Sequence, residues 1–290
     1  MIETIKNNFL EVSVKNMGAE LTSLKTVKDG LEFLWQGDEK YWTSQSLILF
    51  PIIGGLPDDK YILYGQEYTM NSHGFAKDME FELVDKTEAV ICYKISHDES
   101  TLKQYPFKFE LLISYIIEGN TLKHRFRVNN LDDKEMLFSV GGHPGFNCPL
   151  YPGEKMENYH LVFEKTEKLE RRLKAAGLLT GEKREFMNGE KEKTLEHSLF
   201  YNGAVILDNV ASRWLEIRSS NNPRVIRAEF DGFPYLGIWS AKNDGPYVCI
   251  EPWYGIDSTS GDSYDFENKE GLLRLQAGKS FECEYRIIVE

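Results

Sequence analysis

The sequence lacks the features that define several large classes of protein. No stretch approaches the roughly 18 consecutive apolar residues that a membrane-spanning helix needs, and the N-terminus has no basic start followed by an apolar run. We therefore expect neither a transmembrane helix nor a signal peptide. The few cysteines (Cys92, Cys148, Cys249 and Cys283) lie far apart, without a CxxC pair or a zinc-like spacing. Together these absences predict a cytoplasmic protein with reduced thiols.

Positive charge is also scarce. The 46 aspartates and glutamates outnumber the 34 lysines and arginines, and the formal net charge is −12. A surface of this sign repels polyanions, so we expect binding neither to nucleic acid nor to an anionic membrane. It also disfavours a heavily phosphorylated substrate, and no glycine-rich phosphate loop is present. A neutral small molecule is the simplest ligand.

The chain has no Pro/Gly/Ser-rich linker and no repeat with a period of about 20–50 residues, so we expect one domain over residues 1–290. What dominates instead is alternation of apolar and polar residues, as in TLKHRFRVNN at 121–130 and FECEYRIIVE at 281–290. Further short apolar runs are separated by turn signals such as KDG, EGN and SSNNP. Aromatic residues, at 13%, also suit pleated sheets. The pattern predicts an all-β fold, a large antiparallel sandwich with few short helices.

Residues 154–200 break this alternation. They are rich in Glu and Lys, and EKTEKLERRLKAAGLL at 164–179 is their most helix-like piece. We expect a mostly exposed excursion with at most short helices, and we expect the helix of the molecule to be confined mainly to it. The charge run indicates a solvated face and not a partner site.

Two segments place a histidine among glycine and proline. In NSHGFAK at 71–77, Gly74 after His73 leaves room for a ligand to approach the backbone; a loop histidine beside a turn glycine is the alternative. In GGHPGFN at 141–147, His143 precedes a proline, which fixes φ and removes a donor. We expect the preceding strand to stop there and His143 to project into open space; a structural corner is the alternative.

A third segment, YVCIEPW at 247–253, places Glu251 directly after an apolar strand. Glutamate is almost never buried unless it is paired or used, and an apolar pocket would raise its pKa towards the range of a general base. A strand-end carboxylate facing water is the alternative. His73 and His143 are 70 residues apart and HisxxxHis spacing is absent, so spacing neither supports nor excludes a metal site. We expect no metal and no other cofactor, and a set of groups for proton transfer.

In their order along the chain, these segments resemble those of the aldose 1-epimerase family, and most closely its LacX-like branch. SHGFAKDMEF looks like the HGFAR-type segment of that family, GGHPGFNCPL like its HPYFNL-type segment and IEPWYGIDS like its glutamate segment. The similarity covers essentially the whole chain and includes LFPIIG at 49–54 and DGFPYLGIWS at 231–240. It implies a galactose mutarotase-like supersandwich, and an isomerase that interconverts the α and β anomers of a free aldose.

The resemblance also implies roles for single residues. By their motif positions, His143 would protonate the ring oxygen, Glu251 would take the proton from the C1 hydroxyl, and His73 would hold the anomeric oxygens. Asp231 matches a family aspartate that grips sugar hydroxyls, and Trp239 lies where the family carries an aromatic close to the sugar. With a histidine pKa near 6.5 and a raised glutamate pKa, this predicts a bell-shaped rate, with an acid limb from Glu251 and a basic limb from His143.

Two positions depart from the family pattern. Gly55 stands where an arginine usually follows FPIIG, and Lys77, which we also expect to bind substrate, stands where arginine often follows HGFA. Lysine cannot imitate the planar guanidinium fork. The sugar therefore stays open, and so does the oligomeric state, monomer or homodimer.

Three other functions are compatible with parts of the pattern. A non-catalytic carbohydrate-binding protein or sugar sensor would use the aromatics and Asp231 but would not need His143 together with Glu251. A β-sandwich glycoside hydrolase or lyase generally requires two carboxylates, for which Asp257 is a weaker second candidate. A hexose-phosphate epimerase needs basic residues for the phosphate, and Gly55 counts against it.

Overall fold

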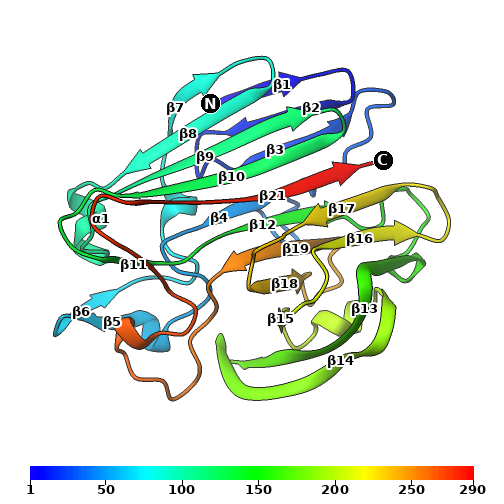
Figure 1. Ribbon diagram of the computed structural model, residues 1–290. Coiled ribbons are helices and arrows are strands. Elements are labelled where there is room, and N and C mark those ends of the chain that lie inside the picture. Colours follow the sequence, from blue (N-terminus) through cyan, green and yellow to red (C-terminus); the bar gives the residue numbers. More distant parts are fainter.

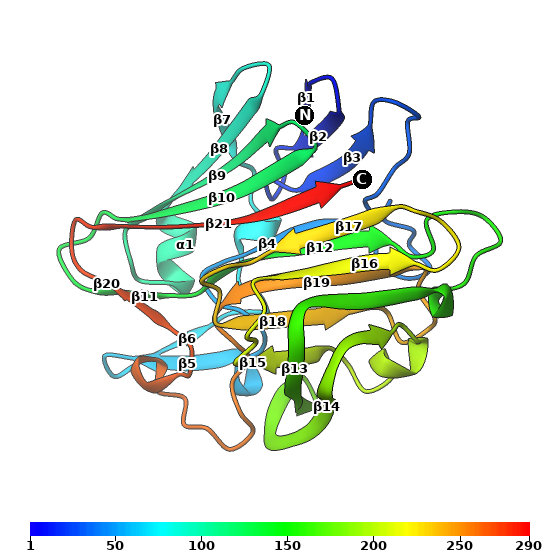
Figure 2. The same ribbon diagram turned by 45° about the vertical axis from the view of Figure 1, so that its right-hand side comes forward.

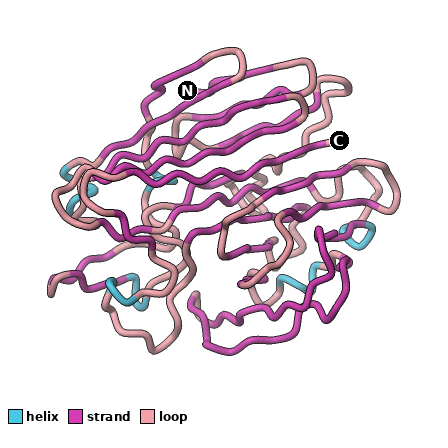
Figure 3. Tube along the Cα trace, viewed as in Figure 1, coloured by secondary structure: helices cyan, strands magenta, loops and turns pink.

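The computed structural model describes residues 1–290, and nearly all of its regular secondary structure is strand, so the expected all-β fold is confirmed (Figure 3). The strands are β1 (Ile2–Lys6), β2 (Leu10–Lys15), β3 (Leu21–Thr26), β4 (Ser46–Leu49), β5 (Lys60–Leu63), β6 (Gln66–Thr69), β7 (Glu82–Lys86), β8 (Val90–Ser96), β9 (Phe109–Glu118), β10 (Thr121–Asn130), β11 (Met136–Phe138), β12 (Val140–Asn147), β13 (Tyr159–Ala175), β14 (Leu178–Thr194), β15 (Val205–Asp208), β16 (Trp214–Ser219), β17 (Val225–Glu229), β18 (Tyr235–Trp239), β19 (Tyr247–Tyr254), β20 (Leu273–Leu275) and β21 (Ser280–Val289). One α-helix, α1 (Glu99–Gln104), and five 3₁₀ turns complete the set: η1 (Pro57–Asp59), η2 (Ala76–Asp78), η3 (Met156–Asn158), η4 (His197–Phe200) and η5 (Phe266–Asn268). No helix is long and apolar enough to cross a membrane.

Most strands belong to one antiparallel sheet of 14 strands (Figure 1). Its order is β4-β12-β19-β18-β15-β13-β16-β17-β21-β10-β9-β8-β7, with β14 paired to β13, and a small sheet of β1, β2 and β3 lies beside β7–β10 (Figure 2). The sheet folds so that two of its parts, β4-β12-β19-β18 and β21-β10-β9-β8-β7, pack on each other; we call them its two arms. A Cβ added to Gly142 of β12 would lie 2.5 Å from the hydroxyl of Tyr285 on β21, so only glycine permits this close approach.

The core between the arms follows the alternation in the sequence. Leu122, His124, Phe126 and Val128 of β10 are fully buried, whereas Arg125 and Arg127 between them reach solvent. Such an inside–outside pattern is what a strand with one covered face requires. The prediction made from this segment is confirmed.

β12 corrects the expectation that the strand stops before His143. The strand runs through Pro144 to Asn147, and Pro144 is paired with Ser46 of β4. On the other side, the ladder to β19 has no pairs between Gly141 and Gly145, which is where proline offers no N–H. The missing donor therefore interrupts the hydrogen bonds of one ladder and does not end the strand.

Residues 154–200 are a second correction, because the segment that seemed most helical, 164–179, forms the later part of β13, the hairpin turn and the start of β14. β13 and β14 form a long hairpin with several register shifts, and β13 also pairs with β16 near its start and with β15 near its end. Pairing with neighbouring strands thus overrides the helix propensity of its Glu and Lys residues. The hairpin closes on Ala176 (φ 49°) and Gly177 (φ 85°), a pair of positive φ values that suits a two-residue hairpin turn.

The α-helix lies outside that segment, at α1. Asp98 precedes it and accepts hydrogen bonds from the backbone N–H groups of Ser100 and Thr101, while the Thr101 hydroxyl accepts one from the Asp98 N–H. These reciprocal hydrogen bonds form a capping box, which stabilises the start of the helix. The prediction that helix is confined mainly to 154–200 was wrong.

Candidate active site

A cavity of about 570 Å³ opens at the β4-β12-β19-β18 end of the long sheet. Four of the predicted site residues line it: His73, His143, Glu251 and Trp239. Its other lining residues are Trp42, Leu47, Lys174, Ala175, Ala176, Gly177, Tyr201, Asn202, Gly203, Ala204, Lys242, Trp253 and Asp257. The structure therefore brings together side chains that are far apart in the sequence.

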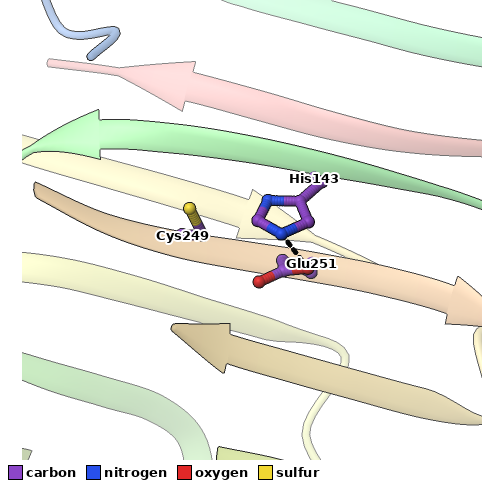
Figure 4. Close-up of side chains that lie close together, drawn as sticks. All are labelled: His143, Cys249 and Glu251. Atoms are coloured by element: carbon purple, nitrogen blue, oxygen red, sulfur yellow. Dashed lines mark ion pairs between the residues drawn. The ribbon is translucent and has the colours of Figure 1, made fainter. Parts of the chain in front are cut away.

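Strand register builds the floor of this cavity. The pairs Gly141–Trp253 and Gly145–Cys249 fix the alignment of β12 with β19, which puts His143 directly opposite Glu251. Residues that face each other across an antiparallel pair point to the same side of the sheet. Accordingly, His143 Nε2 lies 3.1 Å from Glu251 Oε2, with Cys249 beside them (Figure 4).

Both members of this pair are buried. Glu251 is 1% exposed, and burial raises the pKa of its carboxyl well above the usual range, although the charge of Lys174 opposes the shift. Burial also lowers the pKa of His143 to about 3. Both directions favour the uncharged forms, so the resting pair holds one proton and keeps it on Glu251.

The pair is also poorly satisfied. The two groups are within ion-pair distance but are not aligned for a hydrogen bond, and neither Glu251 oxygen nor His143 Nδ1 has any other partner. Buried polar groups without partners cost stability, on the order of 1–3 kcal/mol each. Such a cost is typical of groups that are arranged for a ligand.

His73 lies on the loop after β6. The residue adopts a positive φ of 67°, and its Nδ1 accepts a hydrogen bond of 3.2 Å from the Gly54 N–H. Burial lowers the pKa of His73 to about 4, so the ring is neutral at pH 7 and carries its hydrogen on Nε2. With its ring centroid 5.9 Å from that of His143, His73 can offer one N–H to an oxygen bound between them.

Aromatic rings surround His143. The ring centroid of Trp42 lies 4.9 Å from that of His143, and the ring centroid of Trp239 lies 5.5 Å from it. The two indoles meet edge to face at 5.5 Å. Apolar faces of this kind stack on the C–H face of a sugar ring and exclude water from the reacting groups.

Two predicted residues lie outside the cavity. Lys77 Nζ donates to the Gly74 carbonyl at 2.9 Å and lies 2.6 Å from Asp78 Oδ2, so it braces the His73 loop from behind. Asp231 lines a separate surface hollow with Arg213 and Trp214. It precedes the start of β18, whereas Trp239 ends that strand, and a strand rises roughly 3.4 Å per residue. The expectation that Asp231 and Lys77 line the cleft is therefore corrected.

Three polar or aromatic residues of the cavity wall, Asp257, Trp42 and Lys174, were not assigned to the site from the sequence. Asp257 had a signal, because it lies in the same IEPWYGIDS segment as Glu251. The sequence analysis treated it only as a weaker second carboxylate. Trp42 stands in a loop without a motif, and Lys174 reaches the cavity on a hairpin that the sequence did not reveal. Neither of these two had a signal that distinguished it from its neighbours.

One set of side chains offers metal ligands. Atoms of His143, Cys249 and Glu251 lie within 4.8 Å of one another, and nitrogen, sulfur and carboxylate oxygen suit Zn²⁺. Burial opposes this use, because it raises the pKa of the Cys249 thiol well above its usual range and a metal needs the thiolate. All four cysteines of the chain are free thiols.

The fold and the site together define an all-β protein with a buried histidine–glutamate pair at the base of an aromatic cavity. The chain belongs to the aldose 1-epimerase family, whose sequence model matches residues 1–287. It is similar to the plasmid and chromosomal LacX proteins of Lactococcus lactis subsp. lactis. Each is 38% identical over 280 residues, and the alignment covers 93% of this chain and 93% of the LacX protein. The resemblance found in the sequence is confirmed.

Two solved structures support the fold. A galactose mutarotase related enzyme from Lactobacillus acidophilus superimposes with a TM-score of 0.96 at 32% identity, covering 100% of this chain and 97% of that one. A galactose mutarotase-like protein from Lactobacillus casei ATCC 334 gives 0.94 at 29% identity, with both chains covered completely. The fold is thus galactose mutarotase-like.

Proposed function

We propose that the protein is an aldose 1-epimerase that interconverts the α and β anomers of a free aldose by acid–base ring opening and reclosure. The observation that carries this proposal is the placement of His143 Nε2 3.1 Å from Glu251 Oε2 on the floor of the cavity. Opening the sugar ring removes a proton from the C1 hydroxyl and adds one to the ring oxygen, so it needs two proton-transfer groups beside the C1–O5 bond. Each positioned group raises the rate by roughly 10²–10⁴-fold.

The resting pair is one proton shift from its reactive form. When that proton moves from Glu251 to His143, the carboxylate can take the proton of the C1 hydroxyl while the imidazolium protonates the ring oxygen. The C1–O5 bond breaks, and the products are an aldehyde, a neutral His143 and a protonated Glu251. Rotation about C1–C2 and the reverse transfers then close the ring on the other face and restore both groups.

His73 and Lys174 assist from the cavity wall. The Nε2–H of His73 can donate to the anomeric oxygen as charge develops on it. The charge of Lys174 lowers the pKa of Glu251 and so favours the carboxylate in the reactive form. Neither role requires a metal or an organic cofactor.

The pH profile follows from the pair and not from two independent groups. Because burial lowers the pKa of His143 to about 3 and raises that of Glu251, the pair gains a second proton only in acid and loses its only proton above the usual range of a carboxyl. The acid limb therefore comes from His143 and the basic limb from Glu251, the reverse of the assignment expected from unperturbed pKa values.

A sugar-binding protein without catalysis is the second candidate, since Trp42, Trp239 and the charged groups of the wall would suffice for binding. The test is anomer exchange, followed by NMR or polarimetry, on a panel of freshly dissolved free aldoses. His143→Asn and Glu251→Gln should each lose most of the rate and keep much of the sugar affinity. Full exchange rates in both variants, on every sugar that binds, would leave the binding protein as the better assignment.

A place in the cytoplasm belongs to the same proposal. Its support is the free state of all four cysteines, which is ordinary in a reducing compartment. We also propose that the sugar is the only partner the catalytic step requires.

A further inference from the structure

Lys174 reaches the cavity at the tip of the β13–β14 hairpin. It is the last residue but one of β13, next to the turn of Ala176 and Gly177, and its side chain is 23% exposed. Nζ lies 2.7 Å from Asp257 Oδ1, which is its only hydrogen bond. An ammonium group has three N–H donors, so two remain for a ligand in the cavity.

Asp257 is the acidic member of this pair. Its side chain is 1% exposed, and Oδ1 also accepts a hydrogen bond of 2.9 Å from the Gly55 N–H. The other oxygen, Oδ2, is buried without any partner although the residue lines the cavity. An unpartnered, buried carboxylate oxygen beside a free ammonium N–H is a matched acceptor and donor.

The hairpin also explains Gly55. A Cβ at position 55 would lie 3.0 Å from the Gly177 carbonyl oxygen and 3.5 Å from Leu178 Cδ2. The hairpin turn thus occupies the space that an arginine side chain would need. In this chain the cation on that side of the cavity comes from Lys174.

The pair lies close to the reacting groups. The charges of Lys174 and Asp257 act in opposite directions on the pKa values of both Glu251 and His73. Because the two charges are 2.7 Å apart and of opposite sign, together they present no net charge to a ligand. Such a pair suits neutral hydroxyl groups and offers no net attraction to a phosphate or a uronate.

We propose that Lys174 and Asp257 form a hydroxyl-binding subsite that determines which aldose is accepted. This deepens the proposed function and rests on it: the sugar lies over His143 and Glu251, and a hydroxyl away from the anomeric carbon accepts from Lys174 Nζ and donates to Asp257 Oδ2. The substrate class is an unphosphorylated aldose with a hydroxyl at that ring position.

The test combines enzyme variants with deoxy sugars. Lys174→Met removes the donor and keeps the length of the side chain, and Asp257→Asn keeps an oxygen for the Gly55 N–H. Lys168→Met is the matched control, because Lys168 is exposed on the same strand and makes no ion pair. Exchange rates are measured on the parent aldose and on each of its monodeoxy analogues.

We expect Lys174→Met to raise KM by roughly 10- to 100-fold, the usual loss for a hydrogen bond to a charged group, and also to lower kcat, because the charge of Lys174 favours the Glu251 carboxylate. The deoxy analogue that lacks the bound hydroxyl should lose affinity in the wild type and lose less in Lys174→Met, where only the hydrogen bond to Asp257 Oδ2 remains to be lost. Lys168→Met should behave as the wild type. Melting temperatures show which variants are folded, and Lys174→Met alone suffices if Asp257→Asn fails to fold.

Two results would overturn the subsite. Additive losses for every deoxy analogue would mean that Lys174 contacts no hydroxyl, and a higher kcat/KM for phosphorylated than for free aldoses would mean that the wall is an anion site. If the wild type exchanges no aldose at all, the proposed function fails instead. The same variants and analogues, compared by sugar-binding titration, then still decide whether the pair binds a hydroxyl.

Discussion

His124 and His143 are both buried histidines that face a polar partner across an antiparallel strand pair. His124 of β10 lies opposite Tyr285 of β21, with Nδ1 2.5 Å from the tyrosine hydroxyl, and His143 lies opposite Glu251. Burial lowers the pKa of each to about 3. Neither burial nor pKa therefore distinguishes the core region from the site. The difference is the partner, a neutral hydroxyl in one case and a carboxyl that faces a cavity in the other.

The largest expected effect separates the two regions in catalysis. His143→Asn and Glu251→Gln should each slow anomer exchange by on the order of 10²–10⁴-fold, because each removes one proton-transfer group. His124→Phe should leave the rate per folded molecule unchanged, since His124 does not line the cavity. Steady-state rates on one accepted aldose measure both. An equal loss of rate in His124→Phe would show that catalysis depends on the core histidine as much as on His143.

The pH dependence of the rate should show the coupling of His143 to Glu251. We expect a plateau through neutral pH, an acid limb near the lowered pKa of about 3 and a basic limb above the usual carboxyl range. Exchange catalysed by the buffer is subtracted at each pH with the Glu251→Gln variant. An acid limb near the ordinary histidine value of about 6.5 would indicate a solvated His143.

In acid unfolding the two histidines should behave alike. An unfolded histidine takes up a proton below about pH 6.5, whereas the folded one stays neutral down to its lowered pKa, so stability falls as the pH drops through this window. Each buried histidine contributes roughly 1.4 kcal/mol per pH unit. His124→Phe and His143→Asn should therefore each make the decline less steep, measured by denaturant unfolding at a series of pH values. An unchanged slope in either variant would mean that its histidine is already protonated in the fold.

The smallest expected effect concerns the stability cost of Glu251. Its folded pKa is raised, so above the unfolded value of about 4.3 the folded protein holds a proton that the unfolded chain releases, and stability is lost as the pH rises. Glu251→Gln removes this cost and should raise the free energy of unfolding at pH 7 by about 1 kcal/mol or more, with no gain near pH 4. A variant that is less stable than the wild type at pH 7 would show that the carboxyl is ionised and satisfied.

The sequence predicted the parts of the molecule in which local pattern and burial coincide. Alternation located β10 and β21 because each has one covered face. The three motifs around His73, His143 and Glu251 located the floor of the site because they lie on or beside adjacent strands.

The remaining parts depend on contacts that no local pattern records. β13 takes its conformation from β14, β15 and β16, and the entry of Lys174 into the cavity depends on the length of the hairpin. Asp231 was misplaced because it sits in the right motif but before the start of β18, away from the end at which Trp239 lines the cavity.

The register between β12 and β19 also limits how this protein can change by insertion and deletion. One extra residue in β12 would turn His143 to the opposite face, towards Tyr285, because side chains alternate along a strand. An insertion near the turn of the β13–β14 hairpin would instead move only Lys174 and its neighbours. The positions of His143 and Glu251 are therefore fixed by the sheet. The proposed hydroxyl-binding subsite, in contrast, can change with the length of the β13–β14 turn.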